Sequence, residues 1–343
     1  MIVCHARNVS EAWALFHRNI VHGKESTRIV APRGVKTIEF REPVSTVYHC
    51  PNECVLLDPV RDANPFFHLY EALWILCGFN DVKRVSYYSK QIAEYSDDAT
   101  TFHGAYGHRM RFAYGMDQIE AVVDTLSRDP WSRRAVIGLW SPTLDIAQEQ
   151  SGAAKDIPCN TTLYFKLREG QLHITVSNRS NDAVWGCYGA NAVQFSILQQ
   201  YIAARLGRAV GTYTQVSDSL HVYLDGKAGE VWARCHRSPP PLLQSYAPDD
   251  LGVEYVPLAK DAVRFYNEAQ QLLADPSGRP AMRAYREPFF NFVAMPLFYA
   301  HECYREGSAR EGLEVLRQSA ELQPDYARNA WLVAGAQWLA RRV

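Results

Sequence analysis

The segment that most constrains the fold is an almost wholly apolar helix early in the chain. It reads NPFFHLYEALWILCG and begins at Asn64. Pro65 suits a first helical turn, and the large apolar side chains after it are too numerous for one narrow stripe. The sequence therefore predicts a helix that is buried on most sides. Glu71 lies inside this helix. Because an unpaired buried charge is costly, Glu71 is either a structural carboxylate with a partner or a functional one.

Hydrophobic patterns predict both strands and helices on either side of this segment. Helices are expected over 9–20, 117–127 and 191–206, the last ended by Gly207. Strands are expected over 34–40, 45–50, 135–140 and 211–224, and a hairpin over 163–167 and 171–178. We interpret 135–140 (AVIGLW) as an interior strand. Because strict strand and helix alternation is missing, the predicted class is α+β.

The length of 343 residues fits one large domain with an appendage. The pattern changes after about residue 226, Pro239 to Pro241 form a break, and nearly everything from 261 on is helical in period. The last helices have tetratricopeptide-like spacing, but one such unit cannot make a repeat array. We therefore expect a catalytic domain over 1–260 and a helical extension over 261–343 that docks as a cap, with partner binding as the alternative.

Composition excludes several classes of protein. Lysine and arginine total 36 and aspartate and glutamate 37, so no polycation is present to coat nucleic acid. No apolar run is long enough to cross a bilayer. The eight cysteines form no dense framework, and the N-terminus resembles no signal sequence, which predicts a reduced, cytoplasmic protein. Cys50 and Cys54 have no second pair with zinc spacing, so no metal is expected, and no P-loop or dinucleotide fingerprint is found.

Cys159 is a candidate nucleophile. It lies in DIPCNTT, between a polar loop and a strand start, where a thiol can be exposed and activated by nearby cations. A lone cysteine is more often structural, so cationic partners decide the question. Arg133 with Arg134, and Arg179 with Ser180, can make bidentate hydrogen bonds to a phosphate, although any single arginine is more often a surface ion pair. Together they suggest a small phosphorylated substrate.

Eight motifs in order resemble the thymidylate synthase superfamily. They are EALWIL (71–76), GAYG (104–107), DPWSRR (129–134), PCN (158–160), NRSND (178–182), WG (185–186), GAN (189–191) and SLHVY (219–223). The resemblance covers about residues 30–225 and implies a mixed β-sheet with long buried helices. RGVKTIEF, RSND and SLHVY are most similar to the deoxycytidylate hydroxymethylase branch.

The resemblance also implies roles for the matching residues. Cys159 would add to C6 of a pyrimidine nucleotide, so that C5 attacks the one-carbon unit of the co-substrate 5,10-methylenetetrahydrofolate. Glu71 would organise water and proton transfer, and Tyr106 would support it. Asn160 takes the place of the histidine that usually follows the nucleophile.

Substrate contacts follow from the same resemblance. The nucleotide phosphate would be held by Arg179, Ser180, an N-terminal arginine (Arg33 or Arg28) and, from the second subunit of a homodimer, Arg133 and Arg134. Base and sugar would be contacted by Asn191, Asn178, His221 and Tyr223, and folate by Asp182 and Gly186. Without the resemblance, His221 would be an ordinary strand residue and Asn191 a helix N-cap, a position that Asn191 can also hold beside its role with the base.

Two departures from the family's pattern bear on the product. The short apolar tail that closes over folate is replaced by the long helical extension, and Asn160 and Met110 stand where the family usually has histidine and tryptophan. Hydride transfer needs a dry pocket, so we expect water to complete the reaction and give a 5-hydroxymethyl nucleotide. Cytidylate, CMP or dCMP, is favoured over uridylate. The alternatives are a dUMP hydroxymethylase, a thymidylate synthase making dTMP, and an inactive nucleotide-binding member of the family.

Overall fold

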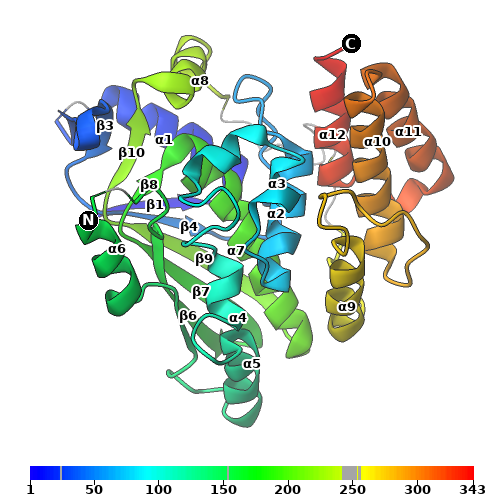
Figure 1. Cartoon of the computed structure of the whole chain (residues 1–343), viewed down its shortest axis with the longest axis horizontal. Helices are drawn as coiled ribbons and strands as arrows, with labels where there is room; N and C mark the ends of the chain where they lie inside the picture. The colour runs from blue at the N-terminus through cyan, green and yellow to red at the C-terminus, as the bar shows by residue number, and fades with distance from the viewer. Residues whose placement is uncertain (24, 153, 242–252, 254–255) are drawn as a thin grey trace.

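Two β-sheets form the centre of the molecule (Figure 1). The computed structural model of the chain describes residues 1–343 apart from 24, 153, 242–252 and 254–255. The strand order is β1-β4-β9-β7-β6-β5 in the six-stranded sheet and β2-β3-β10-β8 in the four-stranded sheet. The strands are β1 (Ile2–Ala6), β2 (Thr27–Val30), β3 (Thr37–Phe40), β4 (Val44–Tyr48), β5 (Val136–Gly138), β6 (Asn160–Arg168), β7 (Gln171–Asn178), β8 (Asn181–Asp182), β9 (Ala209–Ser217) and β10 (Leu220–Tyr223).

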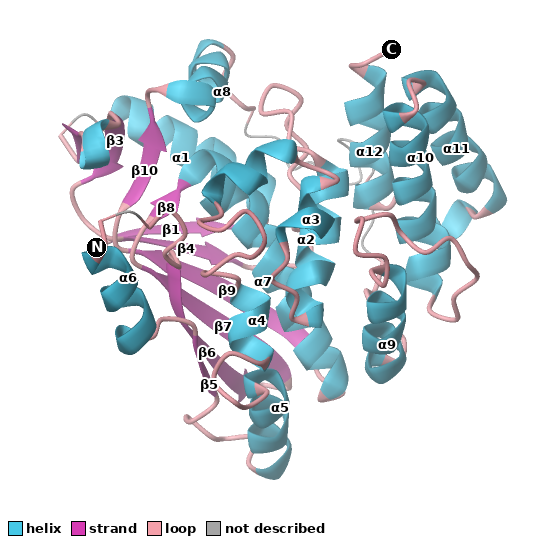
Figure 2. Ribbon diagram, viewed as in Figure 1, coloured by secondary structure: helices cyan, strands magenta, loops and turns pink. Residues whose placement is uncertain are grey.

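Helices pack on one face of the larger sheet, and further helices lie around its edges (Figure 2). They are α1 (Val9–His22), α2 (Pro65–Cys77), α3 (Val82–Ser86), α4 (Tyr106–Arg111), α5 (Gln118–Arg128), α6 (Ala147–Gln150), α7 (Asn191–Arg205), α8 (Gly226–Arg237), α9 (Ala262–Leu272), α10 (Met295–Arg305), α11 (Ala309–Leu322) and α12 (Ala330–Ala340). This mixture confirms the α+β class. Buried and partly exposed residues alternate along β7 and β9, because α7 packs on one face and the other stays partly open.

The buried helix predicted from the sequence is α2. Asn64 caps it through a bond from the Phe67 N–H, and Gly78 ends it at φ 81°. All but one of its residues are buried, because α4, α7, α9, α10 and α12 pack around it. The helix is therefore the centre of the molecule, as its composition requires.

Three sequence expectations about strands are corrected. The strand expected over 34–40 begins only at Thr37, because Arg33 and Gly34 form a turn with positive φ. The segment 135–140 yields the short β5 at the sheet edge, not an interior strand. The segment 211–224 divides into β9 and β10, which belong to different sheets. Helix α8 was not predicted.

The C-terminal helices pack against the rest of the chain on the side away from β8 and β10 (Figure 1). Phe66 of α2 contacts His301 and Trp338, with ring centroids 4.9 and 5.3 Å apart. Near the C-terminus, Arg341 and Arg342 both bind the Asp62 carboxylate. The described part of this extension therefore packs against α2 and the segment before it.

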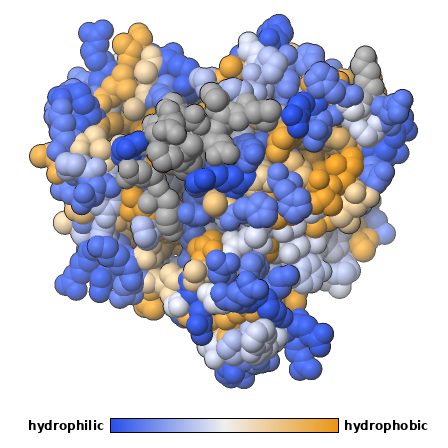
Figure 3. All heavy atoms as spheres, turned by 180° about the vertical axis from the view of Figure 1, so that it is seen from behind, coloured by the Kyte–Doolittle hydropathy of each residue, from blue (hydrophilic) through white to orange (hydrophobic). Residues whose placement is uncertain are grey.

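The rear face of the molecule carries both hydrophilic and hydrophobic side chains. Apolar residues gather toward the right of the reversed view, the side on which the N-terminal strands lie (Figure 3). Within the described residues, no helix is both long and apolar enough to cross a membrane.

Candidate active site

Cys159 lies at the start of β6, where two strands of a hairpin end together. The register pairs Asn160 with Asn178, and the Arg179 N–H donates to the Cys159 carbonyl at 2.9 Å. The side chain of Arg179 donates to the Ile157 and Pro158 carbonyls, each at 2.8 Å, and its Nη2 is 4.0 Å from the Cys159 Sγ. The hairpin thus brings the thiol and one predicted phosphate ligand to the same point.

The electrostatic surroundings of the thiol include both signs of charge. Burial raises the pKa of Cys159, Arg179 and Arg33 act to lower it, and Asp156 and Asp182 act to raise it. The influence of Arg33 also distinguishes the two N-terminal arginines. Arg28 is bound to Glu39 at 2.6 Å, whereas Arg33 is exposed on its turn and its charge acts on the Cys159 thiol.

The second arginine pair lies elsewhere in the same chain. Val136 pairs with Tyr164 in antiparallel register, so Arg134 lies across from about Lys166. Cys159 is seven residues away along β6, which is about 23 Å at about 3.3 Å per residue. Arg133 and Arg134 are exposed and line a surface hollow with Trp131. The pair therefore lies beside the strand that begins after Cys159 but far from the thiol of its own chain, and its predicted role in phosphate binding depends on the second subunit.

Glu71 is buried between α2 and α7. Its Oε2 accepts a hydrogen bond from Gln194 Nε2 at 2.7 Å. Burial raises the pKa of Glu71 to about 7, although the Gln194 bond acts in the opposite direction. The carboxyl group can therefore hold or release a proton near neutral pH, as a general acid or base requires.

Tyr106 begins α4, beside the nucleophile loop. Burial raises the pKa of its hydroxyl well above the usual value, and the charges of Cys159 and Asp156 act in the same direction. Gly107 explains why GAYG is needed here, because a Cβ on it would lie 2.1 Å from the Ile75 carbonyl oxygen of α2. The glycine lets α4 press against the helix that carries Glu71.

Asn160 and Asn178 form a buried amide pair. Asn160 Nδ2 donates to Asn178 Oδ1, and Asn178 Nδ2 donates to the Val216 carbonyl at 3.2 Å. The Asn160 Oδ1 has no hydrogen-bond partner among the described residues. That oxygen is available to a ligand or a water molecule.

The sugar and folate candidates lie along β8 and β10. His221 pairs with Asp182 in parallel register, and the rings of His221 and Tyr223 meet at 5.2 Å. Burial raises the pKa of Tyr223, and Asp182 and Cys159 add to this. Asp182 accepts the Trp185 N–H at 2.7 Å, and burial raises its own pKa. These side chains therefore share the Cys159 end of the sheets.

Asn191 is not the N-cap expected from the sequence. It is the first residue of α7 and continues a π-helical segment, Ala183–Ala190, in which the Asn191 N–H bonds to the Gly186 carbonyl. Its side chain donates to Asn181 Oδ1 at 3.2 Å. Gly186 lies against this amide pair, because a Cβ on it would be 2.9 Å from the Asn181 oxygen.

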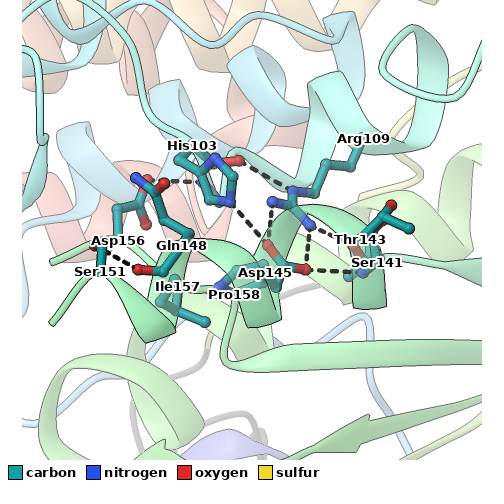
Figure 4. Close-up of polar contacts among 12 residues, drawn as sticks. His103, Arg109, Ser141, Thr143, Asp145, Gln148, Ser151, Asp156, Ile157 and Pro158 are labelled. Atoms are coloured by element: carbon teal, nitrogen blue, oxygen red, sulfur yellow. Dashed lines mark hydrogen bonds and ion pairs between the residues drawn. The ribbon is translucent and has the colours of Figure 1, made fainter. Parts of the chain in front are cut away.

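The sequence did not predict a buried charged cluster behind the loop that leads to Cys159 (Figure 4). Arg109 makes two bonds of 2.7 Å to Asp145, and His103 lies 2.8 Å from the same carboxylate. Burial opposes ionisation of Asp145, but these partners outweigh it and lower its pKa. Asp156, three residues before Cys159, accepts the Gly104 N–H at 2.8 Å. Spacing in the sequence gives no signal for these pairings.

Metal ligation has no visible basis in this region. No group of three or more histidine, cysteine, aspartate or glutamate side chains in the described ranges is arranged to hold a metal ion.

Comparison with known proteins identifies the family. The thymidylate synthase family model matches residues 34–253, which contain every predicted site residue except Arg28 and Arg33. The chain belongs to the thymidylate synthase family. It is therefore a one-carbon transferase, and its family membership supports folate-dependent C5 modification of a pyrimidine nucleotide.

Relatives within the thymidylate synthase family include hydroxymethyltransferases and synthases. A deoxyuridylate hydroxymethyltransferase of Pseudomonas phage M6 is 37% identical over 308 residues, covering 88% of this chain and 84% of the relative. One of Bacillus phage SP01 is 40% identical over 213 residues, 59% of this chain and 55% of the relative. A putative thymidylate synthase of Methanosarcina barkeri is 31% identical over 226 residues, 64% and 89% of the two chains.

Proposed function

We propose that this chain transfers a hydroxymethyl group to C5 of dUMP, with 5,10-methylenetetrahydrofolate as the one-carbon donor. The arrangement of Cys159 with Arg179, Arg33 and Tyr223 at one sheet end carries the proposal. The M6 deoxyuridylate hydroxymethyltransferase, similar over most of both chains, supports uracil as the base. This replaces the preference for CMP or dCMP drawn from the RSND and SLHVY motifs.

Arginines and strand side chains would bind the nucleotide. Arg179 and Arg33 supply positive charge beside Cys159 and would hold the 5′-phosphate with Ser180. His221 and Tyr223 would bond the sugar hydroxyl, and the Asn191 amide would bond the base edge. Bound in this way, the nucleotide presents C6 to the thiol.

The residues around Cys159 would then activate C5. The thiolate adds to C6, and the electron pair of the C5–C6 double bond becomes available at C5 for bonding to the one-carbon unit. Burial raises the pKa of the Cys159 thiol, so the nearby arginines have to favour the thiolate when the substrate enters. Glu71, with a pKa of about 7, would pass protons at C4 and near the exocyclic carbon.

Folate binding would rely on Asp182 and Trp185. A pterin offers N–H donors and a flat ring, and this pair offers a carboxylate and an exposed indole, supported on its other side by Arg61 at 4.5 Å. The donor set thus fits the group. When bound, methylenetetrahydrofolate supplies the one-carbon unit at the oxidation level of formaldehyde.

Water would complete the reaction. Loss of the C5 proton and cleavage of the bond between the one-carbon unit and its folate nitrogen would release tetrahydrofolate and leave an exocyclic methylene group on the Cys159-bound nucleotide. Water would add to this carbon, its proton would pass toward Glu71, and re-formation of the C5–C6 double bond would expel the Cys159 thiolate. Support comes from Asn160, whose buried Oδ1 has no hydrogen-bond partner among the described residues.

A homodimer would complete the phosphate site. Arg133 and Arg134 lie about 23 Å along the strand from their own Cys159, so they can only act on the site of another subunit. The partly open face of the six-stranded sheet supports a second copy as the occupant. Mixing Cys159→Ala with Arg134→Ala subunits should restore activity through heterodimers with one intact site, and no restoration would refute the shared site.

Dihydrofolate formation with dUMP tests the proposed reaction. The proposal predicts tetrahydrofolate as the folate product and loss of tritium from C5 that depends on Cys159. Cys159→Ala should abolish tritium release while dUMP still binds. Dihydrofolate formation would indicate a thymidylate synthase, and unchanged tritium release in Cys159→Ala would exclude the mechanism.

A further inference from the structure

A chain of buried side chains joins Asn191 to the interior of the sheet. Asn191 Nδ2 donates to Asn181 Oδ1 at 3.2 Å, and Asn181 Nδ2 donates to Gln215 Oε1 at 3.3 Å and to Ser217 Oγ at 3.1 Å. Gln215 Nε2 donates to the Cys187 carbonyl at 3.0 Å and to the Tyr48 hydroxyl at 2.9 Å. We call Asn191, Asn181 and Gln215 the amide relay. All three are buried.

The direction of the amide relay is set at its inner end. A backbone carbonyl only accepts hydrogen bonds, so Gln215 must turn its nitrogen toward Cys187. Its oxygen then faces Asn181, which must answer with its nitrogen. The Asn181 oxygen is therefore the atom that faces Asn191. Each link allows only one orientation of the next amide group.

Local backbone structure makes room for the relay. Residues Ala183–Ala190 form π-helical turns interrupted by a kink at Gly189, and π-helical turns often occur at functional sites. Gly186 within it lies against the Asn181–Asn191 contact, where a Cβ would be 2.9 Å from one amide oxygen and 3.5 Å from the Asn191 nitrogen. A larger residue would displace the two amides.

The fixed amide has consequences for the base that it meets. Uracil offers an N3–H donor and an O4 acceptor, whereas cytosine offers an N3 acceptor and an amino donor. An asparagine amide can bond either base, but only in opposite orientations. Turning Asn191 over would bring its oxygen against the Asn181 oxygen and leave a buried acceptor unpaired, which costs roughly tenfold to a hundredfold in an equilibrium.

We infer that Asn181 and Gln215 are positioning residues that hold the Asn191 amide in one orientation and so decide which pyrimidine base the site accepts. The inference rests on the proposed function only for the identity of that base, uracil. Neither residue belongs to the predicted substrate contacts. Their effect on the base would pass entirely through Asn191.

Paired measurements of dUMP and dCMP test the relay. Asn181→Leu and Gln215→Met keep the approximate side-chain volume but remove the polar link. In both variants the ratio of kcat/KM for dUMP to that for dCMP should fall about tenfold or more. Equilibrium binding of both nucleotides, measured in a Cys159→Ala background, should show the same fall even if turnover becomes too slow to follow.

Gln199→Met is the matched control. Gln199 lies on α7 like Asn191 and is buried. Its Nε2 donates to the carbonyls of Leu172, Gly211 and Thr212, not to the relay residues. This variant should lose stability while its base ratio stays within about twofold. Folded relay variants that keep the wild-type ratio would overturn the inference. If the wild type prefers dCMP, the proposed substrate is refuted. In that case, a ratio of kcat/KM values that moves toward unity in the relay variants would still support the amide relay.

Discussion

Replacing Glu71 by glutamine tests the assignment of a protonated carboxyl group to the centre of α2. Burial raises the pKa of this group from an ordinary 4.5 to about 7 in the folded chain. In the unfolded chain it ionises near its ordinary value. Between these two values the folded state binds a proton that the unfolded state has lost, so stability falls as pH rises.

The size of the effect follows from the same two values. At ~1.36 kcal/mol per pH unit, the interval from 4.5 to about 7 corresponds to about 3 kcal/mol. Wild type keeps this stability at pH values below 4.5 and has lost it above pH 7. Glu71→Gln carries no ionisable group at this position and can still accept the Gln194 bond, so it should avoid the loss.

Urea unfolding of both proteins across this pH range measures the difference. The free energy of unfolding of Glu71→Gln relative to wild type should rise by about 3 kcal/mol from acid to neutral pH, while kcat falls strongly because the variant cannot transfer a proton. Gln194→Met removes the bond that lowers the pKa and should move the transition to higher pH. Parallel pH profiles for wild type and Glu71→Gln would refute the buried, proton-carrying carboxyl group.

Four further substitutions test three separate parts of the site. In steady-state kinetics, Arg33→Ala should raise the KM for the nucleotide by at least tenfold. Arg28→Ala should change this KM little, because the Arg28 side chain is bound to Glu39. A larger rise in KM for Arg28→Ala than for Arg33→Ala would exclude Arg33 as the phosphate ligand. Gly107→Ala places a Cβ 2.1 Å from a backbone oxygen of α2 and should lower the unfolding free energy by about 1–3 kcal/mol in denaturant titrations. Arg109→Met leaves the buried Asp145 carboxylate without its main partner and should cost about 3–5 kcal/mol, so a variant of normal stability would show that the cluster is not held by this pair.

Much of the site could be predicted because its residues are conspicuous where they stand. Glu71 interrupts an apolar helix, and Cys159 follows a polar loop at a strand start, so both stand out without any contact information. Their elements were also predictable, because α2, α5, α7 and the β6–β7 hairpin have strong local periodicity.

Other features depend on contacts between distant segments. Arg109 meets Asp145 only because α4 packs near the loop after β5, and Asn181 meets Gln215 only because β8 and β9 approach each other from different sheets. The segments of β9 and β10 both have strand character, so the sequence pattern does not show that they belong to different sheets. Likewise, helical period predicts the extension but not that it packs behind α2. Tertiary packing, not local propensity, decides these points.

The mass of the nucleotide product tests the central claim most directly. Purified enzyme is incubated with methylenetetrahydrofolate and, separately, with dUMP, dCMP and CMP, and each nucleotide is analysed by mass spectrometry. The proposed reaction predicts a product from dUMP that is heavier by one CH2O group, and little product from the two cytidylates. A product heavier by one CH2 group, dTMP, or hydroxymethylation of a cytidylate in preference to dUMP, would contradict the account.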